Sequence, residues 1–174
     1  MKPLIGTDLK RFLRDYRREF RPNLDLAFLL QSVEYPYNVG AIFRLADGVG
    51  VTELLLTGIT PTPPHPTVEK IGRYKHHQLP WRYIQDPLEA LRQLKAQAYH
   101  ILALELVDDA QPYHQYSYPA KTCLVVGHED HGLTKTTLAL CDAAVFVPMY
   151  GKGQSHNVAT SLAIVAYHAL HARA

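Results

Sequence analysis

Short apolar runs alternate with amphipathic segments along most of the chain, and this alternation restricts the fold more than any other feature. Apolar runs typical of buried strands include LAFLLQSV at 26–33 and TCLVVG at 122–127. Segments with helical periodicity separate them, such as NVGAIFRLADGVG at 38–50 and DPLEALRQLKAQA at 86–98. Such alternation is typical of βα units. It predicts an α/β fold with a mostly parallel sheet and helices on both faces.

The same patterns predict the remaining elements. A proline-rich stretch at 60–66 indicates a surface loop within one domain rather than a linker between two. We expect further strands at 52–58, 79–84, 100–106 and 143–148, and helices at 133–141 and 157–172.

The first 22 residues are expected to form a basic helix ahead of a single domain at 23–174. Thr7 or Asp8 is the predicted cap of this helix, and Pro22 is predicted to end it. Its apolar side chains recur with helical spacing and form one stripe. They are Leu9, Phe12, Leu13, Tyr16 and Phe20.

Charge is distributed unevenly. Residues 1–21 hold seven basic and three acidic side chains, although the whole chain has a net charge of only +2. The basic side chains lie mostly off the apolar stripe, so they form either a solvated face or a phosphate-contacting face. The arginines concerned include Arg11, Arg14, Arg17 and Arg18.

Two features bear on the compartment. No apolar run approaches the ~18 residues that a membrane span needs, and the N-terminus lacks the apolar core of a signal peptide. The two cysteines, Cys123 and Cys141, lie in apolar stretches that are typical of buried, reduced thiols. We therefore expect a cytoplasmic protein without membrane contact.

Ligands of parallel α/β sheets bind beyond the carboxyl ends of the strands, so the loops there are the candidate sites. In the first loop, EYPYNVGAIFR, Asn38 suits a helix N-cap. Arg44 follows among apolar residues, and an arginine in such a setting requires solvent or an anion as its partner.

The second loop, VVGHEDHGL, places Gly127 directly after an apolar strand, where a ligand can approach the backbone. Glu129 could hold that ligand or cap a helix. His128 and His131 suggest a metal, but they lack the spacing of strong zinc motifs, so we expect no metal.

The third loop, PMYGKGQSHN, precedes the last predicted helix. Ser155 suits its N-cap. The glycines at 151 and 153 expose backbone donors and acceptors near a helix N-terminus, which favours binding of an adenine edge or a carboxylate.

Taken in order, the three loops resemble the three motifs of the SpoU/TrmH family of RNA ribose 2′-O-methyltransferases, within the SPOUT superfamily. The resemblance covers residues 26–172, and the arginine-rich first segment is similar to that of tRNA-directed members. The matching residues are Asn38, Gly40 and Arg44; Gly127, Glu129, Gly132 and Leu133; and Pro148, Met149, Ser155, Asn157 and Val158.

This resemblance implies a deep trefoil knot in the C-terminal part of the sheet and a homodimer with the active site at the subunit interface. It also implies S-adenosylmethionine as the cofactor, with no metal. The implied cofactor contacts are Leu104, Glu105, Gly127, Val147, Pro148, Met149, Ser155, Asn157 and Val158.

The implied reaction is attack of a ribose 2′-hydroxyl on the sulfonium methyl group. Arg44 has the central role, either as a base or as a clamp on the neighbouring phosphate, and an arginine is ordinarily always protonated. The residues implied to support it are Asn38, Glu129, Ser155 and Asn157. His156 stands where the family prefers leucine, and as a titratable side chain it could also assist as a base.

The substrate implied by the resemblance is RNA, with tRNA in first place. The alternative substrate is rRNA. The alternative classes of protein are an RNA-binding homologue without catalysis and a flavodoxin-like nucleotide-binding domain. RNA contacts are expected on the first helix and on a loop at 69–77, at Arg11, Arg14, Arg17, Arg18, Arg73 and Lys75.

Overall fold

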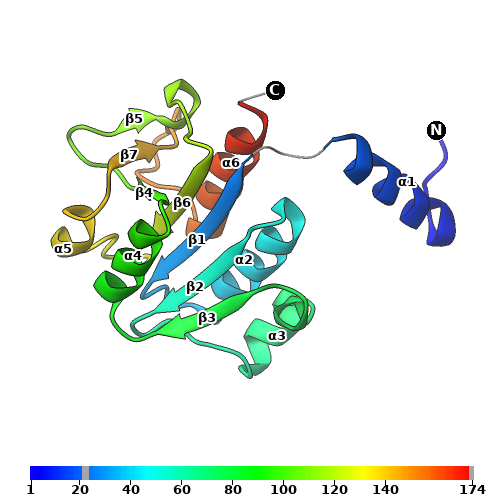
Figure 1. Cartoon of the computed structure of the whole chain (residues 1–174), viewed down its shortest axis with the longest axis horizontal. Helices are drawn as coiled ribbons and strands as arrows, with labels where there is room; N and C mark the ends of the chain where they lie inside the picture. The colour runs from blue at the N-terminus through cyan, green and yellow to red at the C-terminus, as the bar shows by residue number, and fades with distance from the viewer. Residues whose placement is uncertain (21–23, 173–174) are drawn as a thin grey trace.

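Seven strands form a single parallel sheet in the computed structural model, which describes residues 1–20 and 24–172 (Figure 1). Their order across the sheet is β3-β2-β1-β6-β4-β7-β5. The predicted parallel α/β architecture is therefore confirmed. The strands are β1 Asp25–Gln31, β2 Glu53–Thr57, β3 Trp81–Ile84, β4 His100–Leu104, β5 Gln111–Pro112, β6 Lys121–Val126 and β7 Ala143–Phe146.

The centre of the sheet is the pair formed by β1 and β6. Phe28 pairs in register with Leu124, and nearly every residue of both strands is buried. Strands covered on both faces read as continuous apolar runs, which explains why these two segments were recognisable from the sequence.

Helices cover both faces of the sheet, as predicted (Figure 1). Side chains of alternate β1 residues enter two separate cores: Phe28 belongs to one and Leu29 to the other. The helices α2 Pro36–Val49, α3 Pro66–Gly72 and α6 Val158–His171 pack into the first core. The helices α4 Pro87–Ala96 and α5 Lys135–Leu138 pack into the second.

The predicted helix caps are partly wrong. Asp86 caps α4 as expected and accepts a hydrogen bond from the Leu88 amide. Asn38, however, lies inside the first turn of α2, because the proline at 36 occupies the first turn and moves the helix start forward. Asn157, not Ser155, caps α6 and accepts from the amides of Ala159 and Thr160.

Two regions contain more structure than expected. The segment at 69–77 is not a loop, because it includes most of α3 and a 3-10 helix, η1 Lys75–His77. The two-residue strand β5 and the 3-10 helix η2 Tyr113–Gln115 were not predicted. Elements this short carry too few residues to show a periodic pattern.

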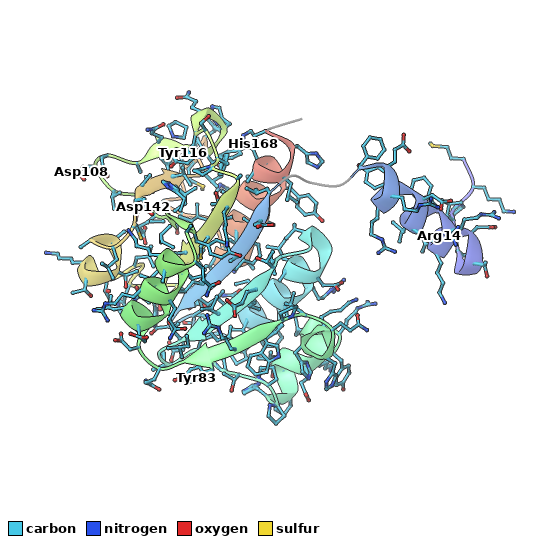
Figure 2. The ribbon with its side chains drawn as sticks, in the orientation of Figure 1. Arg14, Tyr83, Asp108, Tyr116, Asp142 and His168 are labelled. Carbon is cyan, nitrogen blue, oxygen red and sulfur yellow. The ribbon has the colours of Figure 1, made fainter. Side chains whose placement is uncertain are left out.

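The N-terminal helix α1 Gly6–Glu19 forms as predicted, but its cap position is Ile5, without a side-chain cap. The helix lies apart from the sheet (Figure 1). Figure 2 marks its position by the label of Arg14. Its apolar stripe is exposed, including Phe12 and Phe20. Pro22, the predicted helix stop and domain boundary, falls outside the described residues. Among the residues that the structure describes, no helix is long and apolar enough to cross a membrane.

Candidate active site

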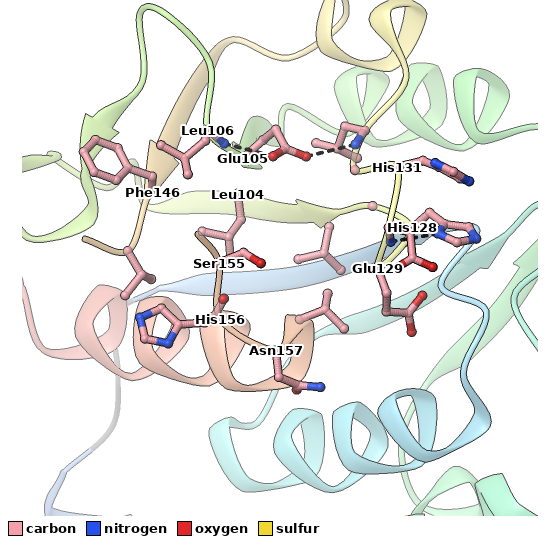
Figure 3. A pocket seen from close by; sticks show the side chains of 18 of the residues that line it. Leu104, Glu105, Leu106, His128, Glu129, His131, Phe146, Ser155, His156 and Asn157 are labelled. Carbon is pink, nitrogen blue, oxygen red and sulfur yellow. Dashed lines mark hydrogen bonds between the residues drawn. The ribbon is translucent and has the colours of Figure 1, made fainter. Parts of the chain in front are cut away.

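A cavity of about 860 Å³ opens at the carboxyl ends of β4, β6 and β7 (Figure 3). Its walls come from residues 104–107 after β4, 126–133 after β6, 146–147 after β7, and the start of α6. All three loops singled out in the sequence reach this cavity. The second and third loops form parts of its wall, and the first contributes Tyr35 and Asn38. The cavity therefore lies at the carboxyl edge of the sheet, where the sequence leads us to expect the site.

Most of the side chains expected at a cofactor line the cavity. Pro148 and Met149, which were also expected there, are not among the lining residues. The expected residues that do line it are Leu104, Glu105, Gly127, Val147, Ser155, Asn157 and Val158.

A chain of hydrogen bonds joins the three loops. The Asn157 side-chain amide donates to Asn38 Oδ1 at 2.9 Å, and Asn38 Nδ2 donates to Glu129 Oε1 at 2.7 Å. The two bonds connect residues 119 and 91 positions apart in the sequence. Asn38, Glu129 and Asn157 are thereby held as one unit at the rim of the cavity.

The directions of these bonds fix what each group can do. Asn157 Oδ1 accepts from the first amides of α6, so its nitrogen must point to Asn38. The Glu129 carboxylate accepts from the backbone amides of Glu34 at 2.9 Å and Tyr35 at 3.1 Å, in addition to Asn38. With three N–H groups as partners, the Glu129 carboxylate ties the loop after β6 to the start of α2.

Glu105 makes a second carboxylate bridge across the cavity. Its oxygens accept from the Leu106 amide at 2.9 Å and the Leu133 amide at 3.0 Å (Figure 3). The bridge ties the loop after β4 to the loop after β6. The glycine at 132 has a left-handed φ of +63°, and a Cβ there would overlap the Glu105 carboxylate.

Gly127 lies where two stretches of backbone meet. A Cβ at this position would overlap the backbone of Gly132. The amide of His128 donates to the Gly132 carbonyl at 3.2 Å, and the reverse bond is 2.8 Å long. Glycine is therefore required at 127 by the tight hairpin as well as by any ligand that approaches the strand end.

Three carboxylates and one ammonium group are the charged side chains that line the cavity: Glu105, Glu129, Asp130 and Lys135. The Asp130 carboxylate raises the pKa of the neighbouring Tyr35 hydroxyl, and burial adds to the effect. The cavity thus has an excess of negative charge, which favours a ligand that carries a positive group.

His128 has a role that the sequence did not indicate. Its Nδ1 accepts from the Asp130 amide at 3.1 Å, and its Nε2 lies 3.1 Å from the Glu34 carboxylate. The ring therefore supports the loop between β6 and α5. His156, like His131, lines the cavity with an exposed side chain.

The basic side chains expected at the RNA lie elsewhere. Arg44 is exposed on α2 and is not among the residues that line the cavity. Lys75 pairs with Asp47 at 2.8 Å, and Arg73 is an exposed residue with a left-handed backbone. On α1, Arg11 pairs with Asp8 at 2.9 Å. The α1 arginines, Arg11, Arg14, Arg17 and Arg18, are all exposed.

This fold and cavity define a parallel α/β domain with a cavity of small-molecule size at the carboxyl edge of its sheet. A sequence model described as the SpoU rRNA Methylase family matches residues 25–167, which is most of the chain. The chain therefore belongs to the SpoU methylase family, and the resemblance seen in its three loops is confirmed.

Relatives and solved structures agree with this membership. The chain is 33% identical over 160 residues to the tRNA (guanosine(18)-2′-O)-methyltransferase of Thermus thermophilus, covering 92% of this chain and 80% of that protein. It is similar to the crystal structure of the Aquifex aeolicus TrmH/SpoU tRNA modifying enzyme, with a TM-score of 0.77 and 28% identity over 95% of this chain and 84% of the other.

A third comparison is with the SpoU methyltransferase AviRb from Streptomyces viridochromogenes, whose crystal structure is a complex with the cofactor AdoMet. The TM-score is 0.79 at 24% identity, and the match covers 88% of this chain and 59% of AviRb. This likeness shows that the two proteins share a fold.

Proposed function

We propose that this protein transfers a methyl group from S-adenosylmethionine to a ribose 2′-hydroxyl in RNA, with tRNA as the substrate class. The observation that carries the proposal is the hydrogen-bond chain from Asn157 through Asn38 to Glu129 at the mouth of the cavity. It unites the three family motifs in one site. The tRNA assignment is supported by the 33% identical relative, which is named as a tRNA methyltransferase.

The cavity suits S-adenosylmethionine in size and charge. Its volume of about 860 Å³ falls within the ~300–1,000 Å³ usual for small-molecule pockets. Glu105, Glu129 and Asp130 supply negative charge for a sulfonium. Gly127 offers a backbone edge, and Leu104, Val147 and Val158 offer apolar walls. The cofactor supplies an electrophilic methyl group, so the chain's own residues must orient the hydroxyl and remove its proton.

The residues of the chain divide these tasks. Glu129 already accepts three N–H groups, so in our proposal it holds the loop and Asn38 in place. Ser155 and Asn157 face the cavity and orient the ribose. Arg44 is assigned to the phosphate beside that ribose, because its exposed guanidinium can form a bidentate pair with a phosphate.

We further propose that the enzyme is a homodimer. Two large apolar side chains that line the cavity are exposed, Tyr35 at 48% and Leu106 at 59%. A second copy packed here would cover them and bring its own basic side chains toward the site. Such a partner also accounts for an Arg44 that does not line the cavity of its own chain.

Three further expectations belong to the same proposal. The C-terminal part of the domain forms a trefoil knot, which is supported by β6 entering between β1 and β4 and β7 between β4 and β5. The α1 arginines contact the RNA backbone, and residues 1–22 act as a substrate-binding arm of the domain at 23–174. The enzyme works in the cytoplasm.

The decisive experiment is transfer of labelled methyl from S-adenosylmethionine to total RNA, followed by mapping of the 2′-O-methylated nucleotide. We expect the label in tRNA. Label in rRNA instead would make rRNA the substrate class. Arg44→Ala should fold and bind the cofactor but lose methyl transfer. Arg92→Ala, an exposed arginine on α4, is the matched control and should retain it. A wild-type protein that transfers no methyl to any RNA would refute the proposal.

A further inference from the structure

A cluster of metal-ligating side chains lies at the opposite edge of the domain from α5, where α3 meets η1. Glu69 of α3 and the consecutive histidines of η1, His76 and His77, bring one ligand atom each to within 4.8 Å of one another. None of the three lines the cavity described above. The two elements that carry these side chains, α3 and η1, pack against each other and against α2, and α3 lies near β3 (Figure 1).

One pair in the cluster already has the spacing of neighbouring zinc ligands. Zinc binds histidine nitrogen and carboxylate oxygen at about 2.0–2.2 Å in a tetrahedral arrangement, which separates neighbouring ligand atoms by roughly 3.3–3.5 Å. Glu69 Oε1 and His76 Nε2 are 3.3 Å apart. The His76 and His77 rings have centroids 3.9 Å apart. Since all three ligand atoms lie within 4.8 Å of one another, rotation of the exposed His77 side chain is the main adjustment that binding one ion requires.

The frame around the cluster holds His76 in place. Its side chain is only 8% exposed, its backbone carbonyl accepts from Trp81 Nε1 at 3.1 Å, and Phe43 packs edge-on against its ring. A ligand whose rotamer is fixed by packing loses little freedom when it binds a metal. Lys75, the residue before it, pairs its ammonium with the Asp47 carboxylate at 2.8 Å.

The backbone between the ligands is strained. Arg73 and Tyr74 both have left-handed φ values, of +50° and +56°, a conformation that costs of order 1–3 kcal/mol for each non-glycine residue. Glu69 lies before this pair and the two histidines lie after it. A metal held by all three would brace the strained turn from both sides.

We propose that Glu69, His76 and His77 form a binding site for Zn²⁺, with a water molecule in the fourth position. Two imidazoles and one carboxylate are a ligand set that zinc accepts, and the exposed side of His77 leaves room for the water. The site joins α3 to η1. It has no part in methyl transfer, and it stands or falls independently of the proposed activity.

The test uses the untagged 174-residue chain after treatment with a chelator. Titration with Co²⁺ should give the visible absorption of a tetrahedral site at one equivalent per chain, and Zn²⁺ should displace it. His77→Gln, which changes an exposed side chain, should weaken the apparent affinity by more than about tenfold, since even the loss of a partner that only supports a ligand costs 10–100-fold.

Controls separate this site from adventitious binding. His114→Gln changes an exposed histidine on η2 and should bind as the wild type does. Glu69→Gln should weaken binding to the same degree as His77→Gln. The proposal is overturned if the wild type shows no tetrahedral Co²⁺ spectrum, or if His77→Gln and Glu69→Gln bind with the affinity of His114→Gln.

Discussion

Asn157 has two separable tasks, and a pair of substitutions distinguishes them. Its Oδ1 caps α6 through the amides of Ala159 and Thr160, at 3.0 and 3.2 Å, while its Nδ2 donates to Asn38. Asn157→Ala removes both. The lost cap costs about 1 kcal/mol, and the lost side-chain hydrogen bond about 0.5–1.5 kcal/mol, so the free energy of unfolding should fall by about 1.5–2.5 kcal/mol.

Asn157→Asp retains the cap but has no donor for Asn38. A carboxylate at a helix N-terminus is favourable by about 0.3–1 kcal/mol, which offsets part of the lost bond, so this variant should stay within about 1 kcal/mol of the wild type. Methyl transfer should nevertheless fall at least about tenfold in both variants, because small displacements of positioning groups slow a reaction strongly.

The assays are urea unfolding and transfer of labelled methyl to RNA. Asp86→Ala provides the control, because Asp86 caps α4 in the same way but lies outside the cavity lining. It should lose about 1 kcal/mol of stability with full activity. The reasoning is wrong if Asn157→Asp transfers methyl at the wild-type rate, or if it is as unstable as Asn157→Ala.

Gly132→Ala should lower the free energy of unfolding by roughly 2–4 kcal/mol, because the alanine backbone must keep a left-handed φ and its Cβ displaces the Glu105 carboxylate. Gly151→Ala, where a Cβ meets open space, should lower it far less in the same urea titration. Neutralising the α1 arginines with glutamine should weaken RNA binding and flatten its dependence on salt; a filter-binding series whose slope stays unchanged would remove α1 from the RNA-binding surface. Burial raises the pKa of Cys141 to about 11, so at pH 8 a thiol reagent should modify it about a hundredfold more slowly than a free thiol, and the rate should rise as the pH increases toward that pKa; rapid labelling of the folded protein at pH 8 would contradict this.

The sequence predicted the elements of the fold well and their boundaries less well. Buried strands such as β1 and β6 were visible as apolar runs because they are covered on both faces. The strand order could not be read in the same way, since nothing local to residues 121–126 says that they pair with β1. That pairing depends on how two distant segments pack, and each of them is apolar enough to fit several positions in a sheet.

The motifs predicted a candidate site, and the structure brings most of their residues to one cavity in an arrangement that the sequence did not indicate. Asn38 and Ser155 were expected to cap helices, but the proline at 36 and the better cap at Asn157 displaced them. The hydrogen bonds from Asn38 to Glu129 and Asn157 were not predictable, since no spacing rule relates residues so far apart. Arg44 was grouped with them by motif, yet it is not among the residues that line the cavity.

The hydrogen-bond chain across the site also has a consequence for biosynthesis. It joins Asn38 to partners 91 and 119 residues further along the chain, and contacts over such separations form slowly because a large loop must close first. A nascent chain holds α2 and its Asn38 long before Glu129 and Asn157 have been translated. The cofactor cavity therefore cannot exist on a partly made chain, and the enzyme becomes competent only after almost all of its residues have left the ribosome.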